Sequence, residues 1–414
     1  MRFLSLLMTL IKDNTVKVSF VTIPTTIEPL GIMYLSASLK QAGHECSIGI
    51  DGDILAASIM PGSEGILEIL EKEKKGRRVI VGGPAPTYNP EKYDLPFIDG
   101  ICRGDGEKAI VDFVEGKWTG IYRGELTKAW PIPDRSIIYD NYPEHRDSKI
   151  RHFMLSRGCP FDCNYCFNHS YRKLYRGDNV LRNPNPENAI NEIVDTISKW
   201  GGEFVYFQDD TFNLRQSFLD DFLPLYKERA GLPFHCHLRA ELITDEQIKK
   251  LSEAGCYSAR FAIEIAGDKK QSLLNRGKMT DDDCIKAAET LRKYGVKVMT
   301  QNILCLPDTD IDDDLRTLEL NQKCKPTFAW ASIYQPYKGT KLGDYCYAQG
   351  IVEREAGKFF DGSPLNIPHK KEREALQKCF SMMVTEPDPF SWIYGHYRME
   401  TEKQLYGGMS HQKG

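Results

Sequence analysis

The stretch Gly158-Cys-Pro-Phe-Asp-Cys-Asn-Tyr-Cys166 places three cysteines within eight residues, directly after an apolar run at 152–156. Spacings of four and three residues allow one short loop to wrap three thiolates around a single centre. A structural zinc site normally takes four protein ligands, commonly as two separated pairs, and the sequence has no second cysteine pair. Three cysteines suit a [4Fe–4S] cluster in which one iron lacks a protein ligand and can bind a further molecule.

The residues that follow this loop alternate between predicted strands and helices. Apolar runs of strand length lie at 152–156, 204–208, 234–238, 258–265, 296–304 and 328–334. Helical patterns lie between them at 186–200, 216–229, 245–254, 281–294 and 311–323, and Thr244 and Thr280 are the expected N-caps of two of these helices. Six β/α units predict a partial (β/α)6 barrel of the TIM type, with its chemistry at the carboxyl ends of the strands.

The first 128 residues show a similar alternation. Strands are predicted at 16–23, 45–50, 78–81 and 97–102, and helices at 31–42 and 107–114. They predict an α/β, Rossmann-like domain with a parallel, doubly wound sheet that binds ligands outside the carboxyl ends of its strands. The stretch between Asp51 and Arg77 is short for a full strand–helix unit, so we expect one element there to be degenerate.

Prolines mark the joint between the two α/β segments. Ala129-Trp-Pro-Ile-Pro-Asp-Arg135 predicts an extended linker on the surface. We expect a Rossmann-like domain at 1–128, a linker at 129–150, a barrel at 151–338 and a small C-terminal region at 339–414 that covers the substrate. The aromatic residues near the end of the chain are predicted core residues, with an aromatic-lined cavity as the alternative: Tyr334, Tyr337, Tyr345, Tyr347, Trp392, Tyr394 and Tyr397.

Composition narrows the function classes. The chain has 414 residues, 54 Lys and Arg against 58 Asp and Glu, and a net charge of −4, which does not favour nucleic-acid binding. No apolar run is long enough to span a bilayer, and the apolar start at 1–11 lacks a cleavage site, so we expect a cytoplasmic protein and no membrane partner. The nine cysteines outside the loop are predicted to be small core residues.

The three-cysteine loop resembles the signature of the radical S-adenosylmethionine (radical SAM) superfamily, C-x-x-x-C-x-x-C after the first barrel strand, with Tyr165 as the aromatic residue before the last cysteine. The resemblance implies that Cys159, Cys163 and Cys166 each hold one iron of a [4Fe–4S] cluster. It further implies that SAM chelates the fourth iron and is cleaved to methionine and a 5′-deoxyadenosyl radical. The alternative is a zinc site or an unused thiol loop.

The same resemblance implies SAM-contacting residues at the strand ends. Asp209 and Asp210 follow the second barrel strand and are expected to meet the SAM amino group, with an N-cap role as the alternative. Gly201-Gly202-Glu203 spells the tripeptide that the family uses for this role, but it precedes the strand and is predicted to be a turn. Arg239, Glu264 and Gln301 end or lie on the next strands and are expected SAM contacts, with a salt bridge as the alternative for the first two.

The N-terminal segment resembles the cobalamin-binding domain that precedes many radical SAM barrels. The resemblance is carried by Thr22-Ile-Pro24, by Gly31 to Gly43, by Val81 to Thr87 and by Arg103 to Glu107. It implies cobalamin contacts from Thr22, Pro24, Gly31, Gly82, Gly83, Pro84, Gly104 and Glu107, whereas ordinary turns are the alternative for the glycine loops. The D-x-H-x-x-G loop that supplies a histidine to cobalt elsewhere is absent, and His44 is predicted to be solvated.

The resemblance implies a class B methylase-like, cobalamin-dependent radical SAM enzyme that methylates an unactivated carbon of a small-molecule or peptide substrate. One SAM methylates the cobalamin, and a second yields the radical that takes a hydrogen atom from the substrate. An electron donor such as flavodoxin or ferredoxin is the implied partner. The alternatives are a radical SAM cyclase or rearrangement enzyme of the same architecture, and a non-catalytic iron–sulfur electron carrier.

Overall fold

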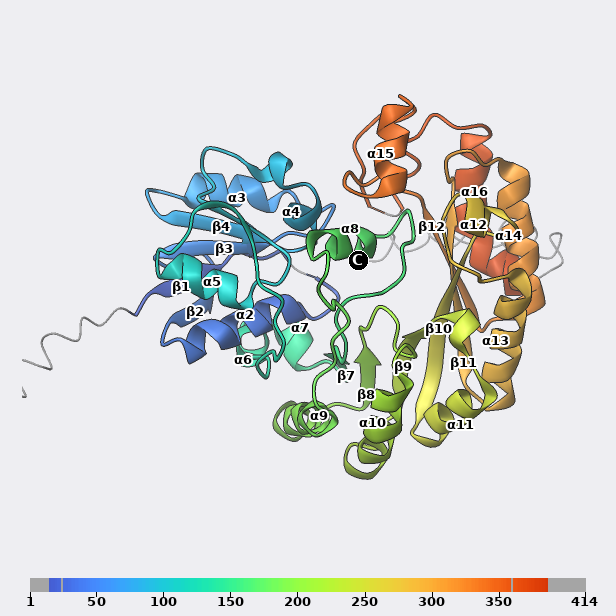
Figure 1. The fold of residues 1–414 in the computed structure, drawn as a ribbon, viewed down its shortest axis with the longest axis horizontal. Coiled ribbons are helices and arrows are strands. Elements are labelled where there is room, and N and C mark those ends of the chain that lie inside the picture. Colours follow the sequence, from blue (N-terminus) through green and yellow to red (C-terminus); the bar gives the residue numbers. More distant parts are fainter. Residues whose placement is uncertain (1–14, 24, 359, 386–414) are drawn as a thin grey trace, which may run out of the picture.

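The computed structural model describes residues 15–23, 25–358 and 360–385. Two α/β units lie side by side, and the loop that carries helix α8 runs between them (Figure 1). The expected elements at 1–11 and the aromatic residues Trp392, Tyr394 and Tyr397 lie outside the described residues. No helix in the described part of the chain is long and apolar enough to span a membrane.

The N-terminal unit is a six-stranded parallel sheet in the order β2-β1-β3-β4-β5-β6. The strands are β1 (Lys17–Phe20), β2 (Glu45–Ile48), β3 (Ile54–Ser58), β4 (Arg78–Gly82), β5 (Gly100–Arg103) and β6 (Gly120–Arg123). Its helices are α2 (Leu30–Gln41), α3 (Ile66–Glu73), α4 (Pro84–Tyr88), η1 (Pro90–Tyr93) and α5 (Glu107–Val114). Apolar side chains are buried on both faces of this sheet, which confirms the Rossmann-like prediction.

Three expectations for this unit were wrong, one of them in part. The stretch between Asp51 and Arg77 holds both a strand and a helix, β3 and α3, because five and eight residues are enough for each. The linker range 129–150 is extended only at its start: residues 129–134 carry no helix or strand and are mostly exposed or half-buried, as predicted, whereas the later part folds into α6 (Ser136–Tyr139) and α7 (Pro143–Arg146) with buried side chains. His44 is only 8% exposed, because β2 begins next to it and its Nδ1 accepts the Val16 N–H at 3.4 Å.

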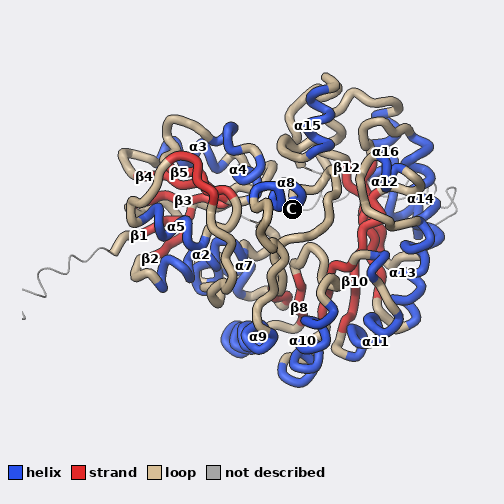
Figure 2. Tube along the Cα trace, in the orientation of Figure 1, coloured by secondary structure: helices blue, strands red, loops and turns tan. Residues whose placement is uncertain are grey.

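The second unit is the predicted partial barrel, six parallel strands in the unbroken order β12-β11-β10-β9-β8-β7. The strands are β7 (Ile150–Phe153), β8 (Phe204–Phe207), β9 (Phe234–Leu238), β10 (Cys256–Glu264), β11 (Lys297–Leu304) and β12 (Phe328–Ile333). The helices are α8 (Asn168–Leu174), α9 (Pro186–Trp200), α10 (Gln216–Arg229), η2 (Ala240–Leu242), α11 (Asp245–Glu253), α12 (Lys269–Ser272), α13 (Asp281–Lys293) and α14 (Ile311–Cys324). Figure 2 shows the long helices on the outside of the curved sheet.

Alternating burial along the strands separates the two faces of the barrel sheet. In β11, Val298, Thr300, Asn302 and Leu304 are buried beneath the helices, and Met299, Gln301 and Ile303 alternate with them. Thr244 and Thr280 cap α11 and α13 as predicted, the second through a capping box. After β12 the chain forms α15 (Lys341–Ala348) and α16 (Lys370–Thr385), and α16 packs against β12 and α14. Of the nine cysteines outside the loop, only Cys46 and Cys379 are not buried.

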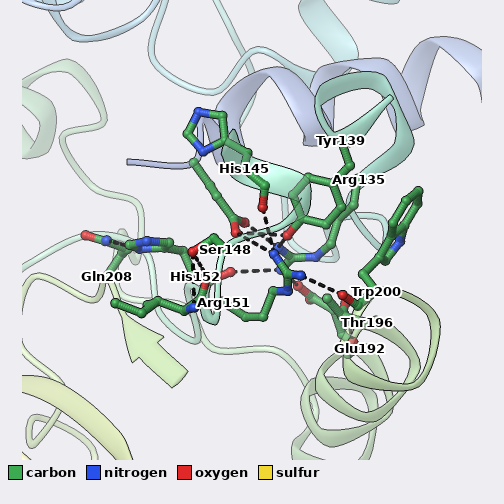
Figure 3. Close-up of polar contacts among 12 residues, drawn as sticks. Arg135, Tyr139, His145, Ser148, Arg151, His152, Glu192, Thr196, Trp200 and Gln208 are labelled. Atoms are coloured by element: carbon green, nitrogen blue, oxygen red, sulfur yellow. Dashed lines mark hydrogen bonds and ion pairs between the residues drawn. The ribbon is translucent and has the colours of Figure 1, made fainter. Parts of the chain in front are cut away.

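A buried charge cluster joins the two units (Figure 3). Arg135 donates to Glu28 of the N-terminal unit at 2.7 Å and to Glu192 of α9 at 3.2 Å. Tyr139 donates to the other oxygen of Glu28 at 2.9 Å. Arg151 on β7 borders the same cluster and donates to the backbone carbonyl of Trp200 at 2.6 Å. These contacts fix the orientation of the sheet relative to the first barrel strand.

Candidate active site

The three-cysteine loop leaves the carboxyl end of β7 and runs into α8. Cys159 and Cys163 are buried and Cys166 is half-buried. Gly158 begins the loop at φ +82°, and a Cβ there would lie 2.2 Å from the Val180 carbonyl oxygen, so the turn requires glycine. The three cysteines thus lie close to one another in the loop that follows β7.

The surroundings of the thiols suit an iron–sulfur cluster. Arg239 Nη1 lies 3.8 Å from Cys163 Sγ, and Asn168 Nδ2 lies 3.7 Å from Cys166 Sγ. Such N–H groups stabilise the negative charge of a thiolate-bound cluster. Burial raises the pKa of the Cys166 thiol to about 12, so loading of the site must release a proton there. No group of three His, Cys, Asp or Glu side chains in the described residues is positioned to hold a single metal ion.

Tyr165 ties the loop to the fourth barrel strand. Its hydroxyl donates to Glu264 Oε1 at 2.6 Å and accepts from Arg276 Nη1 at 2.8 Å. Glu264 sits at a bulge with φ +63°, which turns its side chain at the strand end, and burial raises the pKa of its carboxyl. The alternative expected for Arg239 and Glu264, a mutual salt bridge, does not form among the described residues: Glu264 pairs with Arg276 at 3.8 Å, and Arg239 pairs with Glu241. Arg276, in the loop before α13, carried no sequence signal.

The two aspartates after β8 differ in their surroundings. Both oxygens of Asp209 are occupied, one by the Leu155 N–H at 3.1 Å and the other by the Ser156 hydroxyl, so this carboxylate holds the start of the loop. Asp210 is accessible from the cavity described below and receives a hydrogen bond from Asn168. Neither residue caps α10, which begins at Gln216. Gly201 and Gly202 form a turn before β8 as predicted.

Burial raises the pKa of Asp209 to about 7, which makes stability depend on pH. In an unfolded chain an aspartate titrates near pH 4, so the folded state binds the proton more tightly. The stabilising contribution of that proton is complete in acid and is lost as the pH rises through about 7. Asp209→Asn removes this titration. We expect its free energy of unfolding in urea to rise by about 1–3 kcal/mol relative to that of the wild type as the pH goes from about 5 to 8. Parallel pH profiles of the two proteins would contradict the assignment.

Gln301 lies on β11 beside Ala262 of β10 and Trp330 of β12, on the face away from the outer helices. It is half-buried and lies at mid-strand. The structure thus places Tyr165, Arg239 and Glu264 together around the loop, Asp210 at the cavity and Gln301 deeper along the sheet.

A cavity separates the carboxyl edge of the N-terminal sheet from the barrel mouth. Its lining on one side includes Gly31, Gly82, Gly83, Gly104 and Glu107, five of the eight expected cobalamin contacts. On the other side it is lined by Ser156, Arg157, Gly158, Asn168, Gln208 and Asp210. Thr22 and Pro84 are not among its lining residues, and Thr22 bonds to Tyr142 instead. Pro24 lies outside the described residues.

The glycine-rich edge of this cavity lets a ligand approach the N-terminal sheet closely. Gly31 has no atom within 4 Å of an added Cβ, so the first turn of α2 leaves open space on the cavity side. Gly82 ends β4 at the same edge. No histidine of the described ranges lines this cavity. The residues present thus fit a corrinoid that receives no histidine from this edge.

Glu107 and Gly104 dock the cysteine loop onto the N-terminal unit. Arg157, two residues before Cys159, donates to Glu107 Oε1 at 2.6 Å. Asp105 pairs with Arg182 at 2.6 Å and accepts from the Tyr171 hydroxyl. The Arg103–Glu107 motif therefore positions the loop, a role that appears only when the two units are placed together.

Replacing Gly104 should weaken this docking. Its φ is +83°, and an added Cβ would lie 1.9 Å from the Tyr175 hydroxyl oxygen. We expect Gly104→Ala to cost about 1–2 kcal/mol from the left-handed backbone and a further 1–3 kcal/mol from overpacking. Gly116→Ala is the matched control, since its φ is +79° and nothing lies within 4 Å. Equal losses for both variants in urea unfolding would refute the packing role.

A second cavity opens beside the first, between the N-terminal unit and the C-terminal region. Its lining includes Tyr88, Phe167, Tyr337, Tyr347 and Lys338. Tyr88 and Phe167 stack with ring centroids 4.2 Å apart, and Tyr88 lines both cavities. Of the aromatic residues predicted as core, Tyr334 is buried, whereas Tyr337 and Tyr347 line this cavity. The aromatic cavity is therefore present in part.

Comparisons with known proteins agree with the fold. Residues 153–320 match the model of the radical SAM superfamily. An uncharacterized methyltransferase of Pyrococcus horikoshii is 26% identical over 377 residues, which cover 79% of this chain and 80% of the relative. Bacteriochlorophyllide d C-8(2)-methyltransferase of Chlorobaculum tepidum is 23% identical over 340 residues, covering 78% and 74%. Anaerobic cyclases are also among the relatives.

The solved structure of the radical SAM methyltransferase TsrM from Kitasatospora setae, with cobalamin and a [4Fe–4S] cluster bound, superposes with a TM-score of 0.66. It is 14% identical, and the superposition covers 83% of this chain and 79% of that one, which establishes a shared fold. The fold and the loop thus define an α/β protein with a radical SAM partial barrel. Residues 153–320 form a domain of the radical SAM superfamily, and the protein is a radical SAM enzyme related to methyltransferases and anaerobic cyclases. Membership implies a [4Fe–4S] cluster and SAM.

Proposed function

We propose that this enzyme is a cobalamin-dependent radical SAM methyltransferase that methylates an unactivated carbon. The observation that carries the proposal is the shared cavity. One space is lined by the glycine-rich edge of the N-terminal sheet and by residues flanking the cysteine loop. Two cofactors held by the two units would face each other across it, which methyl transfer to a substrate radical requires. The relatives that are named as methyltransferases support the same assignment.

The chain's own residues have distinct roles in this proposal. Cys159, Cys163 and Cys166 would hold the cluster, and Asp210 would meet the amino group of SAM from the cavity wall. Cluster and SAM together supply a 5′-deoxyadenosyl radical, and cobalamin supplies the methyl group. Arg157 and Glu107 keep the loop against the N-terminal unit. The stacked pair Tyr88 and Phe167 separates the two cavities and restricts water at the mouth.

The remaining expectations are part of the same proposal. The substrate is a small molecule or peptide that enters beneath the C-terminal region, and an electron donor such as flavodoxin or ferredoxin reduces the cluster. A cytoplasmic setting would keep the twelve cysteines reduced.

Isotope tracing tests the reaction. The reconstituted enzyme is supplied with methyl-labelled SAM, cobalamin, a reductant and an extract of candidate substrates. We expect 5′-deoxyadenosine, a change in the visible spectrum when cobalamin is added, and the label in a product carbon. Release of 5′-deoxyadenosine with no label in any product would identify a cyclase or rearrangement enzyme and overturn the proposal.

A substitution that fills part of the cavity tests the cobalamin site separately. Gly31→Leu places a side chain into open space and should abolish the spectral change on cobalamin addition while preserving the fold. Gly65→Leu is the matched control, because an added Cβ there also meets nothing within 4 Å and Gly65 does not line this cavity. Undiminished cobalamin binding by Gly31→Leu would place the corrinoid elsewhere.

A further inference from the structure

Arg260 lies on β10 at mid-barrel, beside His237 of β9 in the sheet register. Its Nη2 contacts His237 Nε2, and the Tyr206 hydroxyl lies 3.0 Å from the same nitrogen. Its Nε is buried with no hydrogen-bond partner among the described residues. Arg260 is thus a half-buried cation whose guanidinium contacts a neutral ring, while the charge of Glu264 acts on it from beyond ion-pair distance.

The buried arginines in the described part of the chain are all compensated. Each fully buried arginine in the described residues has a carboxylate oxygen within 4.0 Å: Arg135, Arg151, Arg182, Arg239, Arg276 and Arg373. No such ion pair is recorded for Arg260 in the described part of the chain. A guanidinium removed from water without a counter-charge is unfavourable unless another group compensates it.

The surroundings of Arg260 supply that compensation only in part. Burial lowers the pKa of His235 to about 3 and that of His152 to about 4, so these rings are neutral at pH 7. His235 Nε2 also lacks a partner among the described residues. Glu264, on the same strand, attracts the Arg260 charge from beyond ion-pair distance, but its carboxylate already bonds to Tyr165 and pairs with Arg276. The barrel interior therefore has positive charge and unused hydrogen-bonding groups.

We propose that Arg260, assisted by His237 and Tyr206, binds a carboxylate or phosphate group of the substrate. The inference builds on the proposed function, because it adds the substrate class to that reaction. Arg260 precedes Glu264 by four residues, so its backbone lies about 13 Å further from the barrel mouth along an extended strand. A substrate anchored there would extend its other end toward the cysteine loop. The substrate is thus an elongated anion that reacts at a carbon remote from its charged group.

Anion-dependent stability tests the site without knowledge of the substrate. Full-length reconstituted protein is melted in sodium phosphate, sodium acetate and sodium chloride at equal ionic strength. We expect phosphate or acetate to raise the melting temperature above the chloride value, and the anion that acts identifies the chemical class. Arg260→Met should bind that anion at least about tenfold more weakly, since charge-assisted hydrogen bonds are lost. No specific anion shift in wild type would overturn the proposal.

Further readouts separate binding from structure. Arg260→Met should melt at or above the wild-type temperature in chloride, because it removes a charge that is only partly compensated, whereas a lower temperature would show a structural role and refute the proposal. Arg260→Lys should retain part of the anion shift. Arg146→Met, at an exposed arginine, is the control and should behave as wild type. Release of 5′-deoxyadenosine without substrate should persist in Arg260→Met, so a failure of radical chemistry is distinguishable from a failure of anion binding.

Discussion

Cys163→Ala is expected to abolish release of 5′-deoxyadenosine from SAM. With one of three ligands removed, the loop can no longer hold a cluster that leaves a single iron open to SAM. The effect should be complete, because reductive cleavage of SAM depends on that iron. The measurement is anaerobic incubation of the reconstituted variant with SAM and dithionite, followed by chromatography of the nucleoside products.

The fold should survive this substitution. Cys163 is buried at the barrel mouth and lies outside the main barrel core, so the loss of one sulfur leaves the sheet intact. Cys379→Ala is the control, since this cysteine lies on the outer helix α16 far along the chain from the loop. Wild-type levels of SAM cleavage by Cys163→Ala, or an equal loss in Cys379→Ala, would refute the ligand assignment.

Arg135→Ala is expected to destabilise the protein by about 3–5 kcal/mol, because it leaves two carboxylates buried without their cation. Arg135 pairs with Glu28 and Glu192, both almost fully buried, and burial raises the pKa of each carboxyl. The loss is measured as a shift of the urea midpoint. It should be smaller at low pH, where the two carboxyls become protonated.

An exposed arginine supplies the comparison for Arg135. Arg146 pairs with Asp147 on the surface, and Arg146→Ala should change stability by less than about 1 kcal/mol. Because Arg135 joins the two units, its loss should also lower cobalamin binding in the shared cavity. A stability loss equal to that of Arg146→Ala would show that the buried cluster does not hold the units together.

Regular elements were predictable where local signals were complete. The predictions match the structure to the residue for the helices at 186–200, 216–229 and 107–114 and for the strand at 234–238, because their apolar periodicity agrees with their packing. The strand β6 was missed because it is four residues long and largely exposed at the sheet edge. The helices α6 and α7 were not predicted, because the prolines around them are compatible with a helix start as well as with a linker.

The site was predictable only where a motif is contiguous. The cysteine loop, Tyr165 and the strand-end residues Arg239 and Glu264 meet as expected from strand order. Arg276 and Arg157 reach the site from a loop and a strand end with no motif of their own, so their roles depend on tertiary contacts. Asp209 was expected to contact SAM, yet its oxygens hold Leu155 and Ser156, which sequence spacing does not reveal.

Metal and sulfide analysis of the anaerobically reconstituted enzyme tests the central claim most directly. If Cys159, Cys163 and Cys166 ligate a SAM-binding cubane, the protein should contain about four irons and four inorganic sulfides per chain. The low-temperature electron paramagnetic resonance signal of the reduced cluster should change when SAM is added. Stoichiometric zinc without sulfide, or a reduced cluster whose signal does not change when SAM is added, would contradict the assignment of a SAM-binding cluster.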